Sequence, residues 1–329
     1  RFENHLKKTE IICCDRPDGF TLPAFFGTLV ADTTKMNQQG RGRMDWSSEL
    51  DGFDSNAEKW FDPGSNMVLD FHGDPRNAEF VLFSDGNHHM ALKETIERFR
   101  EKVLGEKPFF FATTPPGPLV RLLEGRKLQI GNLVLSLAPH VFMGPGHVLD
   151  SLVRKGYMET CVPFVCNRGS VLLVRKNNPK EISSVRDLVR KDITVFLSNP
   201  ERERASFEGY RDTLVNLSED KDIMERIRVV YGSTIHHRQA PEAVTRGEAD
   251  AAMLYYHLAL HYTRRFPEMF ELVPLGGTAE QPDPDPGNIT GTTYAGITGD
   301  GGRHGNRFLE FLGTDEIKEI YRYHGLVPM

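Results

Sequence analysis

The sequence predicts an α/β fold of two lobes, with mostly parallel sheets flanked by helices. From residue 78 onward, short apolar runs alternate with amphipathic segments, as strands and helices do in such folds. The stretch 228–256 shows this best, because it reads as strand, polar loop, short helix, turn and second apolar strand. Two segments, 163–175 and 270–298, would cross between the halves. We therefore expect a ligand cleft between two lobes that close by a hinge motion.

The first half of this region alternates strands and helices. Strands are expected at the apolar runs 79–84 and 108–112, and further short apolar runs lie at 134–137 and 140–143. A helix is expected over 90–103, because its apolar residues recur on one face. Shorter helices are expected over 119–123, ended by Gly125, and over 148–155, ended by Gly156.

The second half continues the alternation. A long strand is expected over 163–175, a helix start with a serine N-cap at 183–184, a strand over 193–197 and a helix over 207–217. Within 228–256, the helix begins at His236 and ends at Gly247, and a buried strand follows over 251–256. A single terminal helix is expected over 306–323.

Residues 1–77 look unlike the rest of the chain. They hold both tryptophans and several turn-rich segments, and their helical periodicity is weak. We interpret them as an N-terminal extension or arm. Lobe 1 is then expected to comprise 78–165 plus 275–329, and lobe 2 to comprise 166–274.

Composition excludes two classes of partner. The chain of 329 residues carries a formal net charge of −6 and has no long basic run, which disfavours nucleic acid as a partner. It has no apolar stretch of about 18 residues, so no transmembrane segment is expected.

Three blocks in order resemble a known family. They are CVPFVCNRGSVLLVRKNNPKEISSVRDL at 161–188, the GEADAAMLYY-containing stretch at 228–256, and FLEFLGTDEIKEIYRYHGLVP at 308–328. Together they resemble type II periplasmic (extracellular) solute-binding proteins, in the molybdate-, tungstate- and sulfate-binding branch. The resemblance covers residues 79–329.

The resemblance implies a solute-binding protein, not an enzyme, that captures a molybdate-like oxyanion without a required cofactor. Family members hold the anion with hydroxyl groups and with backbone N–H groups at helix N-termini. Carried over by position, the expected ligand-binding residues are Asn87, His88, Thr113, Thr114, Ser206, His237 and Tyr255. A membrane transporter partner and an extracytoplasmic location, periplasmic or secreted, are implied if the protein is bacterial.

Histidines give the sequence a second interpretation. His88, His89, His237 and His257 stand where the family has small or hydroxyl residues, and Pro116 replaces a family serine. Neutral histidine is a common ligand of transition metals, so these four residues are candidate ligands of a divalent metal ion. An enzyme on the same scaffold is a further alternative. The plainer interpretations are a polar loop at His88 and His89, a core tyrosine at Tyr255 and a turn former at Asp85.

Overall fold

The computed structural model describes residues 71–329, apart from residues 115, 131–132, 202 and 234. The predicted arm before residue 71 lies outside the described residues. Residues Phe71–Gly73, which we assigned to that arm, form strand β1 and pair antiparallel with β3.

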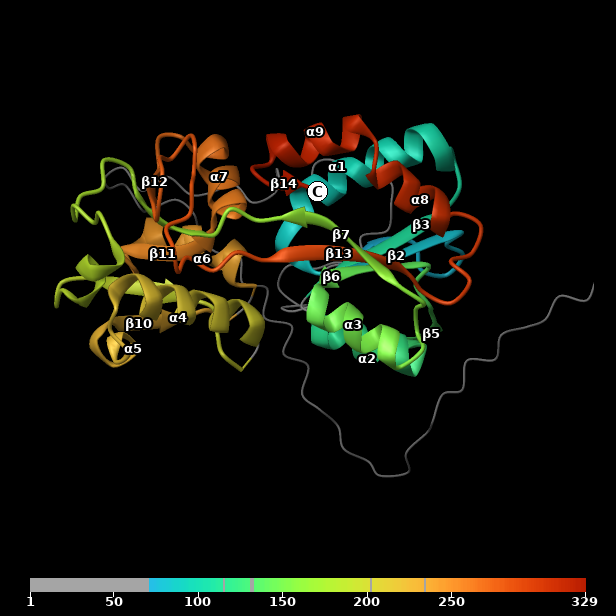
Figure 1. Ribbon diagram of the computed structural model, residues 1–329, viewed down its shortest axis with the longest axis horizontal. Helices are drawn as coiled ribbons and strands as arrows, with labels where there is room; N and C mark the ends of the chain where they lie inside the picture. The colour runs from blue at the N-terminus through green and yellow to red at the C-terminus, as the bar shows by residue number, and fades with distance from the viewer. Residues whose placement is uncertain (1–70, 115, 131–132, 202, 234) are drawn as a thin grey trace, which may run out of the picture. The chain divides into compact units, whose positions relative to one another are not determined.

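Two sheets form the frame of the described residues (Figure 1). The first has the strand order β1-β3-β2-β6-β13-β7-β14. Its remaining strands are β2 (Phe80–Ser84), β3 (Phe109–Thr113), β6 (Val141–Pro145), β7 (Cys161–Cys166), β13 (Thr292–Ile297) and β14 (Val327–Pro328). The second has the order β10-β9-β11-β8-β12. Its strands are β8 (Ser170–Arg175), β9 (Thr194–Leu197), β10 (Arg228–Tyr231), β11 (Ala251–Tyr255) and β12 (Phe270–Pro274). We call the part built on the first sheet lobe 1 and the part built on the second sheet lobe 2.

Both sheets are mixed rather than mostly parallel. Parallel pairing is confined to β3-β2-β6 in lobe 1 and to β10-β9-β11 in lobe 2. The remaining pairs are antiparallel. The parallel strands nevertheless bring several carboxyl ends to one edge of each sheet, which is where a site is expected.

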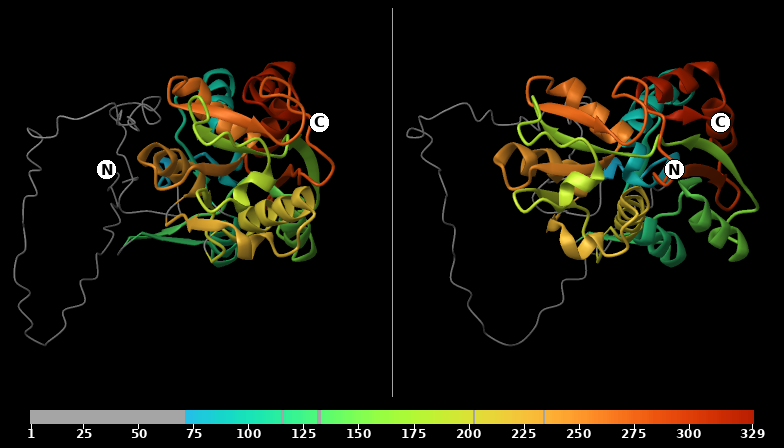
Figure 2. Two further views of the ribbon diagram at one scale, coloured as in Figure 1. Left: turned by 90° about the vertical axis from the view of Figure 1, so that its left-hand side faces the viewer. Right: turned by 60° about the vertical axis from the view of Figure 1, so that its left-hand side comes forward.

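Helices cover both faces of the first sheet (Figure 1). Helices α1 (His89–Phe99), α8 (Gly305–Leu312) and α9 (Asp315–Tyr323) pack on one face, where the rings of Phe80, Phe99 and Phe308 meet. A 3-10 turn (Gly86–His88) precedes α1 and a π-helical turn (Arg100–Leu104) follows it. Helices α2 (Pro116–Gly125) and α3 (Gly146–Arg154) pack on the other face. A ribbon of β4 (Lys127–Ile130) and β5 (Leu133–Ser136) belongs to neither sheet and extends away from them (Figure 2).

The second sheet is covered in the same way. On one face lie α4 (Arg204–Ser218), α5 (Ile223–Arg226) and a 3-10 turn (Val185–Val189). On the other lie α6 (His236–Arg246) and α7 (Tyr256–Arg265). The predicted end of α6 is confirmed, since Gly247 adopts a left-handed conformation with φ 74°.

The first crossing is two strands, not the single strand predicted over 163–175. The chain leaves β7 at Cys166 and enters β8 at Ser170, in the other sheet. The side-chain oxygen of Asn167 accepts hydrogen bonds from the N–H groups of Gly169 and Gly291, and Gly169 has φ 68°. Asn288, in the return segment, accepts from the Ser170 N–H and donates to the carbonyls of Ser170 and Leu275. The two crossing segments are therefore fastened to each other.

The predicted terminal helix is also divided. Helix α8 ends before Gly313, and α9 begins after Thr314, whose backbone is extended at φ −72° and ψ 150°. The break turns α9 so that Ile317, Ile320 and Tyr321 reach the lobe 1 core.

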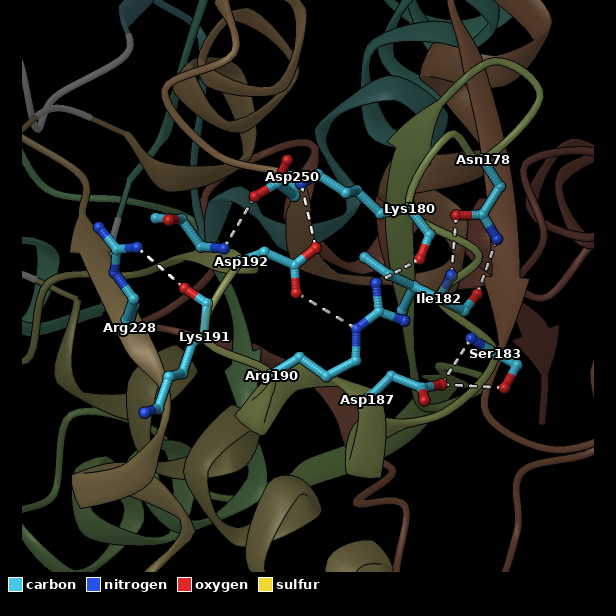
Figure 3. Close-up of polar contacts among 11 residues, drawn as sticks. Asn178, Lys180, Ile182, Ser183, Asp187, Arg190, Lys191, Asp192, Arg228 and Asp250 are labelled. Atoms are coloured by element: carbon cyan, nitrogen blue, oxygen red, sulfur yellow. Dashed lines mark hydrogen bonds and ion pairs between the residues drawn. The ribbon is translucent and has the colours of Figure 1, made fainter.

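A set of polar residues holds the segment 178–192 on lobe 2 (Figure 3). The side chain of Asn178 bonds both the N–H and the carbonyl of Ile182. Arg190 donates to the Lys180 carbonyl and pairs with Asp192. We call this set the lobe 2 polar network; its members are Asn178, Lys180, Ser183, Ser184, Asp187, Arg190, Asp192 and Asp250.

Candidate functional site

A cavity of about 950 Å³ is lined by residues of both lobes. Lobe 1 contributes the ends of β2 and β3 and the turns that follow them, including Asp85, Asn87 and Thr113. Lobe 2 contributes the starts of α4 and α6, including Ser206 and His237. The cavity thus lies where the parallel strands end, as the fold predicts.

Several helices begin at this cavity. First-turn residues of α2, α3, α4 and α6 line it, and so do residues of the turn before α1. The N-cap residues of α3 and α4 are Pro145 and Glu203, and neither makes a side-chain capping hydrogen bond. Orphan N–H groups and the helix dipole give such starts partial positive charge, so they favour an anion.

Asp85 places a carboxylate at the wall of the cavity. Its Oδ1 accepts the Asn87 N–H at 3.0 Å, which caps the 3-10 turn before α1. The residue is only 2% exposed, and burial raises the pKa of its carboxyl group to about 6 against the opposing effect of that hydrogen bond. The prediction of a turn-forming Asp85 is confirmed, but the residue also lines the cavity.

Glu203 places a second carboxylate there, from lobe 2. Its Oε2 accepts the His236 N–H at 2.8 Å, so it occupies the N-terminus of α6. Burial raises the pKa of Glu203 to about 7, although the bond from His236 acts the other way. Two helix starts at the cavity, those before α1 and at α6, are thus already occupied by carboxylates of the chain itself.

Two histidine rings meet at the cavity across the lobes. His89 and His237 stack with ring centroids 4.9 Å apart. The Nδ1 of His89 donates to the Gly86 carbonyl, which fixes the position of that ring. Burial, reinforced by the neighbouring Arg238, holds the pKa of His237 well below its ordinary value, so this imidazole is neutral.

Five of the seven predicted ligand-binding residues line the cavity: Asn87, Thr113, Thr114, Ser206 and His237. The other two do not. His88 is 1% exposed, and its ring nitrogens bond Ser84 Oγ and Tyr321 OH, both at 2.9 Å. Tyr255 packs against Tyr210 and His257 behind the wall, and burial raises its pKa to about 12. The plainer interpretation of a core tyrosine fits this packing.

The four predicted metal ligands do not come together. His89 and His237 line the cavity, whereas His88 is held in the core and the Nε2 of His257 donates to the Asn87 carbonyl. Within residues 71–329 as described, no group of three or more histidine, cysteine or acidic side chains is placed to hold a metal ion. Burial lowers the pKa of His88 to about 3 and that of His257 to about 4, so both are neutral structural groups.

The sequence did not single out several residues of the cavity wall. They are Arg121, His147, Glu203 and Arg238. Glu203 stands in the run ERER, which reads as an exposed charged face. The available signal was position, since this run begins at Glu201, shortly after the buried strand β9 ends at Leu197.

Two mixed sheets joined by paired crossings, with a cavity lined from both lobes, define a two-lobed solute-binding protein. The family of bacterial extracellular solute-binding proteins matches residues 82–327, and the chain belongs to it. The predicted type II binding-protein resemblance is thereby confirmed, and so is the prediction of a binding protein rather than an enzyme. A comparison with curated proteins finds no match.

Solved structures share the fold at low sequence identity. PEB3 from Campylobacter jejuni, with L-phospholactate bound, is 15% identical; the match covers 75% of this chain and 99% of that one, with a TM-score of 0.54. The periplasmic molybdate-binding protein of Azotobacter vinelandii is 14% identical, covering 75% and 98%, with a TM-score of 0.53. The sulfate-binding protein SubI of Mycobacterium tuberculosis is 15% identical, covering 76% and 86%, with a TM-score of 0.56. In the described part of this chain, no helix is long and apolar enough to cross a membrane.

Proposed function

We propose that this protein acts outside the cytoplasm, where it captures a small organic anion in the cavity and delivers it to a membrane transporter. The observation that carries the proposal is that α3 of lobe 1 and α4 of lobe 2 both start at the cavity without a side-chain cap. An oxyanion group of the solute would accept hydrogen bonds from these starts, with the Ser206 hydroxyl beside it. The predicted roles of Asn87, Thr113, Thr114 and His237 stay part of this proposal.

The size of the cavity favours an organic anion over bare molybdate. Cavities that hold small organic ligands are about 300–1,000 Å³, and this one is about 950 Å³. A single tetrahedral oxyanion would fill a small part of that space. The related PEB3 structure holds L-phospholactate, an organic phosphate, which supports this ligand class for the fold.

A transition-metal ion is the less favoured alternative. Only His89 and His237, of the four predicted ligands, line the cavity, and zinc sites in proteins use at least three protein ligands. Divalent metal ions are therefore included as a separate set of test ligands in a thermal-shift experiment.

A thermal-shift panel tests the ligand class. Metal-free protein would be mixed with molybdate, tungstate, sulfate, phosphate, L-phospholactate and other three-carbon phosphates, then with zinc, nickel and copper. A ligand at about a hundred times its Kd stabilises the folded state by about 2.7 kcal/mol, which is a measurable rise in melting temperature. We expect the organic phosphates to give the largest rise. A rise with divalent metals and with no anion would contradict the proposal.

The start of α4 can be tested with one substitution. Ser206→Asp places a carboxylate in the first turn of α4, where it favours the helix but repels an anionic solute. We expect the Kd for the best organic phosphate to rise about tenfold or more, with no loss of thermal stability. Ser206→Asn is the matched neutral control. An unchanged Kd in Ser206→Asp would remove α4 from the anion site.

A further inference from the structure

Each of the two cavity carboxylates keeps one oxygen without a donor. Asp85 uses Oδ1 to accept from Asn87, and no described residue donates to its Oδ2. Glu203 uses Oε2 to accept from His236, and no described residue donates to its Oε1. Both carboxyl groups are desolvated and have few donors, so this pair would be stabilised by a ligand that supplies donors.

A third acceptor lies at the same cavity. His237 is 7% exposed and lines the wall, and its buried Nε2 has no hydrogen-bond partner among the described residues. Because burial keeps this imidazole neutral, one of its nitrogens can accept a hydrogen bond. The cavity wall therefore offers hydrogen-bond acceptors as well as the N–H donors at the helix starts.

Contacts connect the two carboxylates around the stacked rings. Glu203 bonds the N–H of His236, and the next residue, His237, stacks on His89. His89 in turn donates to the carbonyl of Gly86, which adjoins Asp85. Asp85 and Glu203 thus lie at the two ends of one short chain of contacts that runs from lobe 1 to lobe 2.

We propose that the solute carries a protonated amine, which Asp85 of lobe 1 and Glu203 of lobe 2 bind. This inference rests on the proposed capture of an organic anion and makes the solute a zwitterion: its acidic group lies at the starts of α3 and α4, and its amine faces the carboxylates. An ammonium group supplies N–H donors, and its positive charge offsets the negative charges of two desolvated carboxylates. A hydroxyl group of the solute would supply a donor but no charge.

An organic cation fits the wall better than a metal ion does. No group of three or more ligating side chains among the described residues is close enough to hold a metal ion. An amine on a flexible carbon chain needs no such compact set of ligands. Arg204, an arginine of the wall, is paired with Glu208 at 2.7 Å.

A matched pair of probes tests the inference. Isothermal titration calorimetry would compare 2-aminoethylphosphonate with ethylphosphonate, which differ only in the amine, and would include propylamine as a cation without an acid. A hydrogen bond to a charged partner corresponds to about a 10- to 100-fold change in affinity. We expect 2-aminoethylphosphonate to bind at least about tenfold more tightly than ethylphosphonate.

Two variants locate the preference. Asp85→Asn keeps an acceptor for the Asn87 N–H and removes the charge, and Glu203→Gln does the same for the His236 N–H. Each should remove most of the preference for the amine, while Asp192→Asn, outside the cavity, should leave it unchanged. Melting curves of the variants would first establish that each is folded.

The possible results of these titrations distinguish the amine inference from the proposed anion capture. Equal binding of the two phosphonates would overturn the amine inference and leave anion capture standing. Binding of propylamine with neither phosphonate would support the carboxylate pair and overturn anion capture. If none of the three binds, both proposals are wrong, and if the preference survives in both variants, the amine is bound elsewhere.

Discussion

Asp187 and Asp85 both cap a short helical turn, yet their surroundings differ. Asp187 accepts hydrogen bonds from the N–H groups and hydroxyls of Ser183 and Ser184. Burial raises the pKa of Asp187, but these four donors together outweigh it and lower the pKa. Asp85 receives one donor, and burial raises its pKa to about 6. Asp187, with four donors to its Oδ2, serves the fold, whereas Asp85, with a single donor, lines the cavity and is left for a ligand.

The largest effect is expected when the charge of Asp85 is removed. Its pKa is raised from 3.8 to about 6, so the folded state binds more protons than the unfolded state between these values, and stability falls as pH rises through that window. Above it the full cost remains, at most about 3 kcal/mol. Asp85→Asn should therefore be more stable than wild type at pH 8 in urea unfolding, by up to that amount.

Measurement at low pH provides an internal control for the Asp85→Asn variant. At about pH 4 the wild-type Asp85 is already protonated in the folded state, so Asp85→Asn and wild type should unfold at nearly the same urea concentration. Glu203→Gln should gain stability in the same direction but less, because Glu203 is partly exposed. Equal stability of Asp85→Asn and wild type at pH 8 would show that Asp85 is satisfied.

The next largest effect is a loss at Asp250 in the lobe 2 polar network. Its Oδ2 accepts the Thr194 N–H at 2.9 Å at the start of β9, and its Oδ1 lies 3.7 Å from Arg175. Asp250→Ala leaves that N–H unpaired and should lower the free energy of unfolding by about 1–3 kcal/mol in urea. Asp250→Asn retains an acceptor and should lose less.

A smaller loss is expected at Asp187. Removing this cap with Asp187→Ala should cost about 1 kcal/mol in urea unfolding at neutral pH. Because the folded pKa is depressed, the contribution of Asp187 is present above its unfolded value of 3.8 and is lost as pH falls through the folded value. The difference from wild type should shrink below about pH 4, the opposite trend to Asp85→Asn. A difference that grows in acid would contradict the assignment.

The smallest effect is expected at the exposed edge of the network. Lys180 and Asp192 form an ion pair at 3.2 Å in which the lysine side chain is partly exposed and the aspartate side chain is exposed. Exposed pairs contribute little, since water screens them and two long side chains lose freedom. Lys180→Ala should leave the urea midpoint unchanged. A clear loss would indicate that the network acts as one cooperative unit.

Local pattern was enough to predict most elements of the fold. The strands at 80–84, 109–113 and 194–197 are buried apolar runs, and the start of α6 at His236 and its end at Gly247 follow from ordinary helix signals. The pattern failed where the structure depends on distant partners. The break at Asn167 is held by Gly291, and the division of 306–323 depends on how α9 reaches the core of lobe 1.

The site was predicted in part, for a similar reason. Positions carried over from the family resemblance located Asn87, Thr113 and Thr114, but they could not distinguish His88 from its neighbour His89. The 3-10 turn before α1 sends one ring to Tyr321 in the core and the other to His237 at the cavity. Glu203 was missed because its role depends on the His236 N–H, 33 residues away in the sequence.

The fastening of the two crossing segments has a consequence for selectivity. Asn167 joins the first segment to Gly291, and Asn288 joins the second to Ser170, so the segments form one ribbon. We therefore expect the two segments to move together when one lobe rotates against the other. We also expect the extent of that rotation to limit the size of the solute that the lobes can enclose. Asn167 and Asn288 would then influence which solutes are bound, although neither residue lines the cavity.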